Sequence, residues 1–348
     1  MTISRSPGSD PNQTGFNGKL SLGSSAVFLS SIEAIKLTSK DDAVKVLSIP
    51  AGITLDASKG IDTLDMSLSN QKAGAFIDSS KNLAKLGPDS LQITGFDIFI
   101  GTTNDDTFKV DGSISQVDGG AGKKDVLDFS VSKQGVVIND ASKSTNIIAK
   151  NIEQYIGSAF DDTFKVDGPI SQVDGGAGKK DIIDFSGSTL GVVVNDSTRP
   201  NNLIADKIEE YVGSSLNDRI KGTIADEIFR DGAGDDVIFG GGGNDIFYNG
   251  AGNDVYASGE SGDQFIFSGA FGKDGIADTK KGVAIKIGDI DLSTVQWSGI
   301  SIFGIGRFKN PSKTLMLDTD GVSGLITDVA GNELLLGNGF VNGLFTIV

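Results

Sequence analysis

The chain has 348 residues, including 48 glycines but only 7 prolines, and a formal net charge of −16 without a single cysteine or histidine. The acidic charge argues against nucleic acid as a partner, because binding phosphate requires clustered Lys and Arg. The missing residue types exclude a disulfide framework, a thiolate zinc site, the commonest transition-metal ligand and the commonest general base.

The N-terminal residues 1–19 are polar and are expected to be disordered. Residues 1–18 lack the apolar segment of a secretory signal peptide. No run of 18 apolar residues occurs anywhere in the chain, so no transmembrane segment is predicted.

Internal repeats begin after this segment. Residues 105–130 read DDTFKVDGSISQVDGGAGKKDVLDFS, and residues 161–186 repeat them with three differences in 26 positions. Similar lead-in segments place the starts of four units near residues 32, 96, 152 and 208. A solenoid is expected, since one such unit cannot bury its own apolar face. We assign the diverged repeats to residues 20–212.

From Gly213 to Ile266 the chain advances in steps of nine residues, such as GGGGNDIFY at 240–248. Position eight of each step is large and apolar, which predicts a short strand that points this side chain into a core. Two steps complete a coil of 18 residues, so equivalent positions of alternate steps stack. Position six is acidic in all six steps: Asp218, Glu227, Asp236, Asp245, Asp254 and Asp263.

These steps follow the pattern G-G-x-G-x-D-x-U-x, where U is a large apolar residue, and the chain resembles the RTX, or haemolysin-type calcium-binding repeat, proteins of Gram-negative bacteria. The resemblance implies several bound Ca²⁺ ions. We expect an all-β fold: a right-handed parallel β-roll, or solenoid, with the nonapeptide part at 213–267, followed by a small β-rich C-terminal domain.

Stacked coils bring glycine-turn carbonyls and position-six carboxylates together, and six to eight such oxygens are what calcium binds. Residues 231–267 contain seven carboxylates and no Lys or Arg. The best sites are expected to pair Asp236 with Asp254 and Asp245 with Asp263, whereas step 222–230 is weaker. The predicted metal-site residues are Asp218, Gly232, Gly234, Asp236, Gly241, Gly243, Asp245, Gly250, Gly252, Asp254, Gly259 and Asp263.

The diverged repeats leave two interpretations open. Their acids could bind metal, or the adjacent lysine pairs 123–124 and 179–180 could neutralise them without an ion. The acids concerned are Asp106, Asp125, Asp162 and Asp181.

The C-terminal region, 268–348, has balanced charge and alternating apolar runs, and it ends LFTIV. Relatives exported by a type I secretion apparatus have an uncleaved C-terminal signal with a similar apolar ending, although many carry an acidic residue where this chain has Thr346. We expect this region to cap the solenoid and to act as a secretion signal.

The sequence therefore predicts a secreted, extracellular, non-enzymatic protein whose folding is driven by calcium. Its expected site of action is a surface or matrix, with cell-surface or extracellular polysaccharide as a candidate partner. Two alternatives stay open: the calcium-dependent C-terminal portion of a larger secreted hydrolase, and a carbohydrate-binding or carbohydrate-active β-helix module with paired acids.

Overall fold

The computed structural model describes the side chains of residues 34–49, 53–69, 71–257, 262–277, 283–290, 325–328 and 330–336, and the main chain of further strands near both ends. Within these residues the structure is all-β, and its helical element is one short 3-10 turn, Ser79–Lys81. The chain divides into two compact units, residues 1–164 with 168–179, and residues 165–167 with 180–348.

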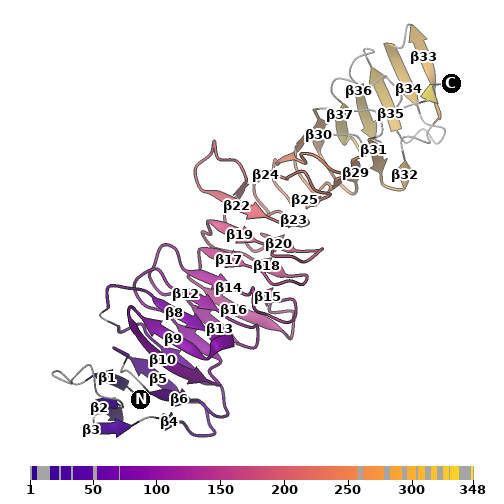
Figure 1. The fold of residues 1–348 in the computed structure, drawn as a ribbon. Helices are drawn as coiled ribbons and strands as arrows, with labels where there is room; N and C mark the ends of the chain where they lie inside the picture. The colour runs from indigo at the N-terminus through magenta and orange to yellow at the C-terminus, as the bar shows by residue number, and fades with distance from the viewer. Residues whose placement is uncertain are drawn as a thin grey trace. The chain divides into compact units, whose positions relative to one another are not determined.

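The first unit consists mainly of short strands paired in parallel with strands of the next coil (Figure 1). Phe99 lies opposite Val117, for example, and Phe108 lies opposite Leu127. The expected lead-in segments near residues 32, 96 and 152 each contain a strand: β4, β11 and β17. Its strands are β1 (Thr2–Arg5), β2 (Phe16–Leu22), β3 (Ser25–Ile32), β4 (Ala34–Lys36), β5 (Ala43–Val46), β6 (Thr54–Asp56), β7 (Thr63–Asp65), β8 (Ala75–Asp78), β9 (Leu83–Leu86), β10 (Asp89–Thr94), β11 (Ile98–Ile100), β12 (Thr107–Lys109), β13 (Gln116–Asp118), β14 (Val126–Asp128), β15 (Val137–Ile138), β16 (Asn146–Lys150), β17 (Gln154–Ile156), β18 (Thr163–Lys165) and β19 (Gln172–Asp174).

Regular structure begins earlier than the sequence indicates. Strands β1, β2 and β3 form antiparallel pairs, although residues 1–19 were expected to be disordered. The predicted domain limits at residues 19, 212 and 267 stay a prediction.

The second unit begins with two parallel faces. One face is formed in order by β20, β23, β25, β27, β29 and β31, and the other by β21, β24, β26, β28 and β30. Its strands are β20 (Ile182–Asp184), β21 (Val193–Val194), β22 (Asn202–Asp206), β23 (Glu210–Val212), β24 (Arg219–Lys221), β25 (Ile228–Arg230), β26 (Val237–Phe239), β27 (Ile246–Tyr248), β28 (Val255–Ala257), β29 (Gln264–Phe267), β30 (Lys273–Ile276), β31 (Ala284–Ile287), β32 (Ile290–Asp291), β33 (Gln296–Ile302), β34 (Ile305–Lys309), β35 (Leu315–Thr319), β36 (Gly324–Asp328), β37 (Glu333–Leu336) and β38 (Thr346–Ile347).

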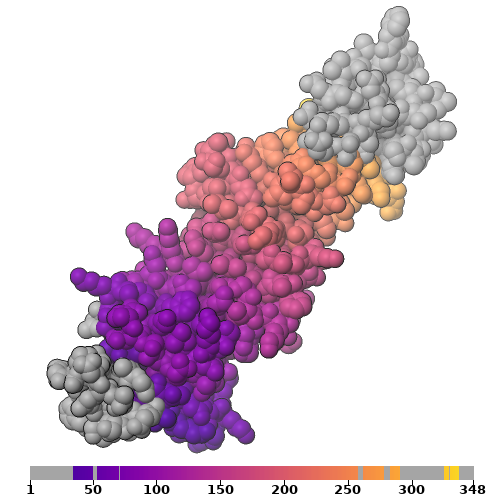
Figure 2. Space-filling model, in the orientation of Figure 1, coloured from indigo at the N-terminus to yellow at the C-terminus, as the bar shows by residue number. Residues whose placement is uncertain are grey.

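The nonapeptide register is the one that the sequence predicts. Phe229 lies opposite Phe247 and Ile238 lies opposite Tyr256, so partners are 18 residues apart. Within each unit the colours of Figure 2 follow one another in chain order, as expected of stacked coils. The parallel β-roll is therefore confirmed.

The core of the nonapeptide coils is formed by position eight of each step. All six side chains are at most 1% exposed: Ile220, Phe229, Ile238, Phe247, Tyr256 and Phe265. On one face the rings of Phe229, Phe247 and Phe265 stack with centroid distances of 5.1 and 4.5 Å. On the other face position eight is occupied by Ile220, Ile238 and then Tyr256.

After these coils the pairing becomes antiparallel along β33 to β37, and β37 returns to pair in parallel with β30. The alternating runs of the C-terminal region thus occur as strands. A search of the described residues finds no helix with the length and apolar character needed to cross a membrane.

Candidate metal centre

One column of buried acids, the first ladder, follows the face of β24, β26 and β28. The main-chain N–H of Asp218 donates to Oδ1 of Asp236 (2.7 Å), and the N–H of Asp236 donates to Oδ1 of Asp254 (2.7 Å). Asp254 donates in the same way to Asp274 (2.8 Å). All four side chains are at most 3% exposed. The structure thus brings Asp236 and Asp254 together, as the sequence predicts, and extends the column by one acid.

Asp274 was missed by the sequence analysis. A signal was present, because residues 269–276 read GAFGKDGI, with glycine at positions one and four, aspartate at six and isoleucine at eight. Two additional residues before Gly269 shift this step out of the nine-residue register.

A second ladder follows the face of β25, β27 and β29. The N–H of Glu227 donates to Oδ1 of Asp245 (3.0 Å), and the N–H of Asp245 donates to Oδ1 of Asp263 (2.9 Å). Each of these acids is at most 1% exposed. The second expected pair, Asp245 with Asp263, is therefore also brought together.

The acids that begin the two ladders are satisfied by hydroxyl groups of their own turns. Ser214 donates its N–H to Oδ2 of Asp218 (2.6 Å) and its hydroxyl to Oδ1 (2.8 Å). Thr223 donates its N–H and hydroxyl to Glu227 in the same way (2.9 and 2.8 Å). Both hydroxyl residues stand at position two, where the repeat pattern has glycine. These first acids therefore have hydrogen-bonded carboxylates without an ion.

The next acids have no such partner. Oδ2 of Asp236 and Oδ2 of Asp245 are buried and lack a hydrogen bond within the described structure, because glycines 232 and 241 stand at position two of their turns. A buried carboxylate oxygen without a partner is energetically costly. A cation bound at these oxygens would remove that cost, so the donor set fits calcium, which prefers oxygen ligands.

The electrostatics of the ladders also favour a cation. Loss of hydration on burial raises the pKa of Asp236 to about 9, and the neighbouring Asp218 and Asp231 contribute. Burial likewise raises the pKa of Asp245 to about 7 and, in the first ladder, that of Asp274 to about 8. The charged forms are disfavoured until a positive charge is present.

Basic side chains of these coils are engaged with other acids. Arg230 pairs with Glu210 (2.7 Å), and Lys273 pairs with Glu333 (3.0 Å). Lys221 pairs with Asp196 (3.1 Å). These three cations are therefore paired with acids that do not belong to either ladder.

Glycine in the turns permits close approach of the coils. Gly232 and Gly241 have φ of 100° and 102°, and a Cβ on either would lie 2.0 Å from a carbonyl oxygen of the coil before, that of Ser214 or Thr223. Carbonyl oxygens therefore line the spaces between turns. The other predicted site glycines 234, 243, 250 and 252 also contact main-chain atoms of the preceding coil, whereas Gly259 lies outside the described residues.

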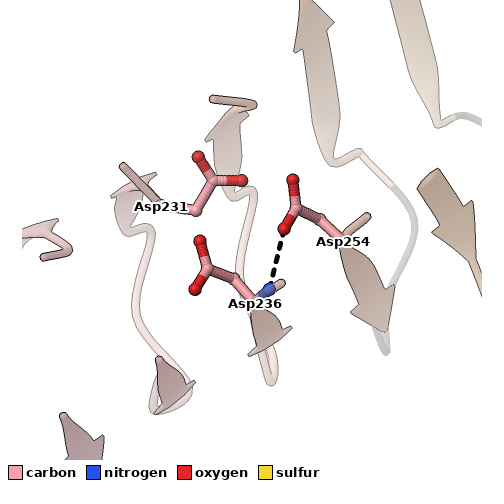
Figure 3. Close-up of side chains that lie close together, drawn as sticks. All are labelled: Asp231, Asp236 and Asp254. Carbon is pink, nitrogen blue, oxygen red and sulfur yellow. Dashed lines mark hydrogen bonds between the residues drawn. The ribbon is translucent and has the colours of Figure 1, made fainter. Parts of the chain in front are cut away.

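One acid near the first ladder does not occupy position six. Asp231 stands at position one, where the pattern has glycine, and is 1% exposed. One ligand oxygen each from Asp231, Asp236 and Asp254 lies within 4.8 Å of the others (Figure 3). The sequence analysis missed this residue, although its departure from glycine at position one was a usable signal.

The diverged repeat in the first unit contains the same arrangement. Thr102 donates its N–H and hydroxyl to Asp106 (2.7 and 2.9 Å), whose own N–H donates to Oδ1 of Asp125 (2.6 Å). Oδ2 of Asp125 is buried without a hydrogen-bond partner, and burial raises the pKa of Asp125 to about 7. A Cβ on Gly120 would lie 2.0 Å from the Thr102 oxygen, as for Gly232 against Ser214.

The second copy begins alike. Ser158 donates its N–H and hydroxyl to Asp162 (2.6 and 2.9 Å). Asp181 is fully buried and donates its N–H to Glu209 (2.7 Å). Both predicted acids thus lie in the interior.

The lysine pair beside Asp125 bonds through its main chain. The N–H groups of Lys123 and Lys124 donate to Oδ1 of Asp105 (2.8 and 3.2 Å), and both residues are exposed. The ion pair described for this repeat joins Lys109 to Asp128 (3.3 Å). In the described structure no contact joins the side chain of either lysine to Asp125, so the metal-free interpretation gains no support from them.

Comparison with known proteins agrees with this geometry. The family model for the RTX calcium-binding nonapeptide repeat matches residues 221–256 in four copies. No curated protein matches the chain.

Proposed function

Starting from a chain that is an RTX, haemolysin-type calcium-binding repeat protein, we propose that extracellular calcium drives its folding and that the folded protein acts without catalysis at a surface or in a matrix. The observation that carries this proposal is the pair of acid ladders. Buried oxygens of Asp236 and Asp245 have no hydrogen-bond donor in the described structure. A fold that buries such groups needs a cation to complete it.

Calcium fits the ladders better than magnesium does. Calcium accepts six to eight oxygens in irregular arrangements, including main-chain carbonyls, whereas magnesium requires a near-ideal octahedron and retains water. The spaces between coils offer carboxylates such as Asp236 and carbonyls such as that of Ser214. We expect several calcium ions in the array.

An extracellular location follows from the supply of the ion. Extracellular calcium modules are tuned to Kd values of roughly 10⁻⁴–10⁻³ M, far above the free calcium of the cytosol. A chain with unneutralised ladders would stay unfolded inside the cell and fold on arrival outside. This coupling suits export by a type I secretion apparatus, for which residues 268–348 are our candidate signal.

A non-enzymatic role is supported by how the acids are used. The position-six carboxylates bond main-chain N–H groups of neighbouring coils and are buried. A glycosidase needs its two carboxyl groups beside a substrate groove. The interior acids therefore support a scaffold that presents its exterior to a partner such as an extracellular polysaccharide.

The test is a titration of the full-length protein followed by far-UV circular dichroism and small-angle scattering. We expect an expanded, largely unstructured chain in chelator, a compact β-rich protein in millimolar calcium, and little change in magnesium. Superimposable spectra and scattering curves in chelator and in calcium would reject calcium-driven folding. The export route is tested by fusing residues 268–348 to an unrelated passenger protein in a cell that has a type I exporter. A passenger that stays inside the cell would reject these residues as the secretion signal.

A further inference from the structure

Position one of a nonapeptide step points toward the position-six carboxylate of the same step. A Cβ on Gly213 would lie 2.7 Å from Oδ2 of Asp218, and a Cβ on Gly240 would lie 2.3 Å from Oδ2 of Asp245. A side chain at position one is therefore directed at the metal-binding oxygens. In step 231–239 that side chain is a carboxylate, Asp231.

The face of the roll decides whether such a side chain fits. On the face of the stacked rings, a Cβ on Gly222 or Gly240 would lie 2.7 or 2.8 Å from Cζ of a phenylalanine. On the opposite face the step of Asp231 carries Ile238 at position eight, and the ring that comes near Asp231, that of Tyr256, meets it with its polar hydroxyl group. Asp231 is thus accommodated where a polar group can reach the first ladder.

Three buried oxygens around this point have no hydrogen-bond partner in the described structure: Oδ1 of Asp231, Oδ2 of Asp236 and Oδ1 of Asn249. Asn249, which also stands at position one, is 8% exposed, and its Nδ2 donates to Asp254 (3.0 Å) and Asp274 (3.2 Å). Its amide therefore lies among the same acids. Figure 3 shows the carboxylates of Asp231, Asp236 and Asp254 pointing toward one another.

We propose that Asp231 is a calcium ligand outside the repeat pattern, and that it makes the site of Asp236 and Asp254 the tightest calcium site of the chain. The inference rests on the proposed function, because it assumes that the ladders bind calcium. Calcium affinity in proteins rises with the number of charged ligands and the rigidity of the site. This site has three carboxylates, all at most 1% exposed, where a pattern site has two.

Tyr256 fixes the third ligand. Its hydroxyl donates to Oδ2 of Asp231 and lies 2.8 Å from Nδ2 of Asn249. The bond restrains Asp231 and leaves Oδ1 available. The competing explanation is that Asp231 serves only as the acceptor for Tyr256 and contacts no ion.

Calorimetric calcium titrations of the full-length protein separate the two explanations. Asp231→Asn keeps the shape and an acceptor for Tyr256, and Asp231→Gly restores the residue of the repeat pattern. We expect each to lower the affinity of the tightest site by roughly tenfold or more, the scale of losing a supporting group at a metal site. The matched control is Asp235→Asn, an exposed acid of the same turn whose replacement keeps an acceptor for the N–H of Asn253. It should lower the affinity far less than either Asp231 variant does.

The outcomes are distinguishable. If the wild-type protein binds calcium and both Asp231 variants keep the tightest site, the inference is wrong and the proposed function stands. If the wild-type protein binds no calcium, the proposed function itself fails. Circular dichroism at saturating calcium verifies that the variants fold, and terbium luminescence excited through tyrosine gives a second reading of the same site.

Discussion

The nonapeptide steps of the second unit and the diverged repeat of the first unit bury acids in the same way but repeat the arrangement to different extents. In each region a turn with a hydroxyl residue at position two is followed, one coil later, by a glycine turn whose acid keeps one oxygen without a hydrogen bond. Ser214 precedes Gly232, and Thr102 precedes Gly120. In the diverged repeat the N–H of Asp125 then donates to Glu153 (2.9 Å), which does not lie in a glycine turn, whereas the first ladder continues to Asp254 and Asp274.

The difference indicates how a metal array is delimited. A hydroxyl at position two donates to the acid of its own turn and replaces the cation there, so it can begin an array. Glycine at position two provides no side-chain donor and leaves one oxygen of the acid dependent on an ion. Consecutive glycine turns therefore build a series of sites, and a single glycine turn builds at most one.

The largest expected effect comes from removing an acid in the middle of an array. Asp245→Ala should lower the calcium affinity of the second ladder by roughly tenfold or more and reduce cooperativity, because Asp245 lies between Glu227 and Asp263. Calorimetric titration measures both quantities.

Asp106→Ala is the matched change at a hydroxyl turn. It should leave the number of bound ions unchanged and lower the free energy of unfolding by about 1–3 kcal/mol, because the N–H of Thr102 loses its acceptor. Equal losses of bound calcium in the two variants would contradict the distinction between hydroxyl and glycine turns.

The next variant asks whether the diverged repeat binds an ion at all. Asp125→Asn should remove one weakly bound calcium ion, since Oδ2 of Asp125 is buried like that of Asp236. Equilibrium dialysis at millimolar calcium counts the ions, with Asp128→Asn as control, because Asp128 pairs with Lys109. An unchanged count in Asp125→Asn would restrict calcium to the nonapeptides.

When calcium is removed, lowering the pH should stabilise both the nonapeptide steps and the diverged repeat. Burial raises the pKa of Asp125 and Asp245 to about 7 and that of Asp236 to about 9, above the value of about 3.9 in an unfolded chain. Folding then takes up protons between these values, so the stability of the metal-free protein falls as pH rises through this window. Ion-paired acids such as Asp78, whose pKa is lowered, limit the gain below about pH 4.

Far-UV circular dichroism in chelator at pH 5 and pH 8 checks this direction: the chain that is largely unstructured at pH 8 should gain β structure at pH 5. In calcium the order should reverse, because protons and calcium compete for the same oxygens. The opposite order in chelator would mean that these acids are not desolvated in the metal-free protein.

The nine-residue period predicted the strands, the inward position eight and both acid pairs of the ladders. It did so because the period alone determines that residues 18 positions apart in the sequence lie above one another in successive coils. The roles of the hydroxyl donors Ser214 and Thr223 were not predicted, and Asp231 was missed. Their partners Asp218, Glu227 and Asp236 come beside them only when the chain is coiled. Whether Lys123 and Lys124 neutralise Asp125 depends on whether their side chains or only their main-chain groups lie near the acids of the turn. The sequence alone does not specify this orientation.

The smallest expected effect tests the hydroxyl turns directly. Ser214→Ala and Thr102→Ala should each lower the free energy of unfolding by about 1–2 kcal/mol, since a typical hydrogen bond contributes about 1 kcal/mol net. Each variant keeps the main-chain N–H bond to its acid, but it loses the hydroxyl that donates to the acid and accepts the N–H of Leu216 or Asn104 (3.0 Å in both turns). Ser214→Thr retains the hydroxyl and is the control, since Thr102 and Thr223 make the same contact in their own turns. Denaturant unfolding in calcium measures the loss, and dialysis should find as many ions as in the wild type. A change in the number of bound ions in either alanine variant would contradict this assignment. It would mean that the hydroxyl does not simply take the place of a calcium ion in these turns.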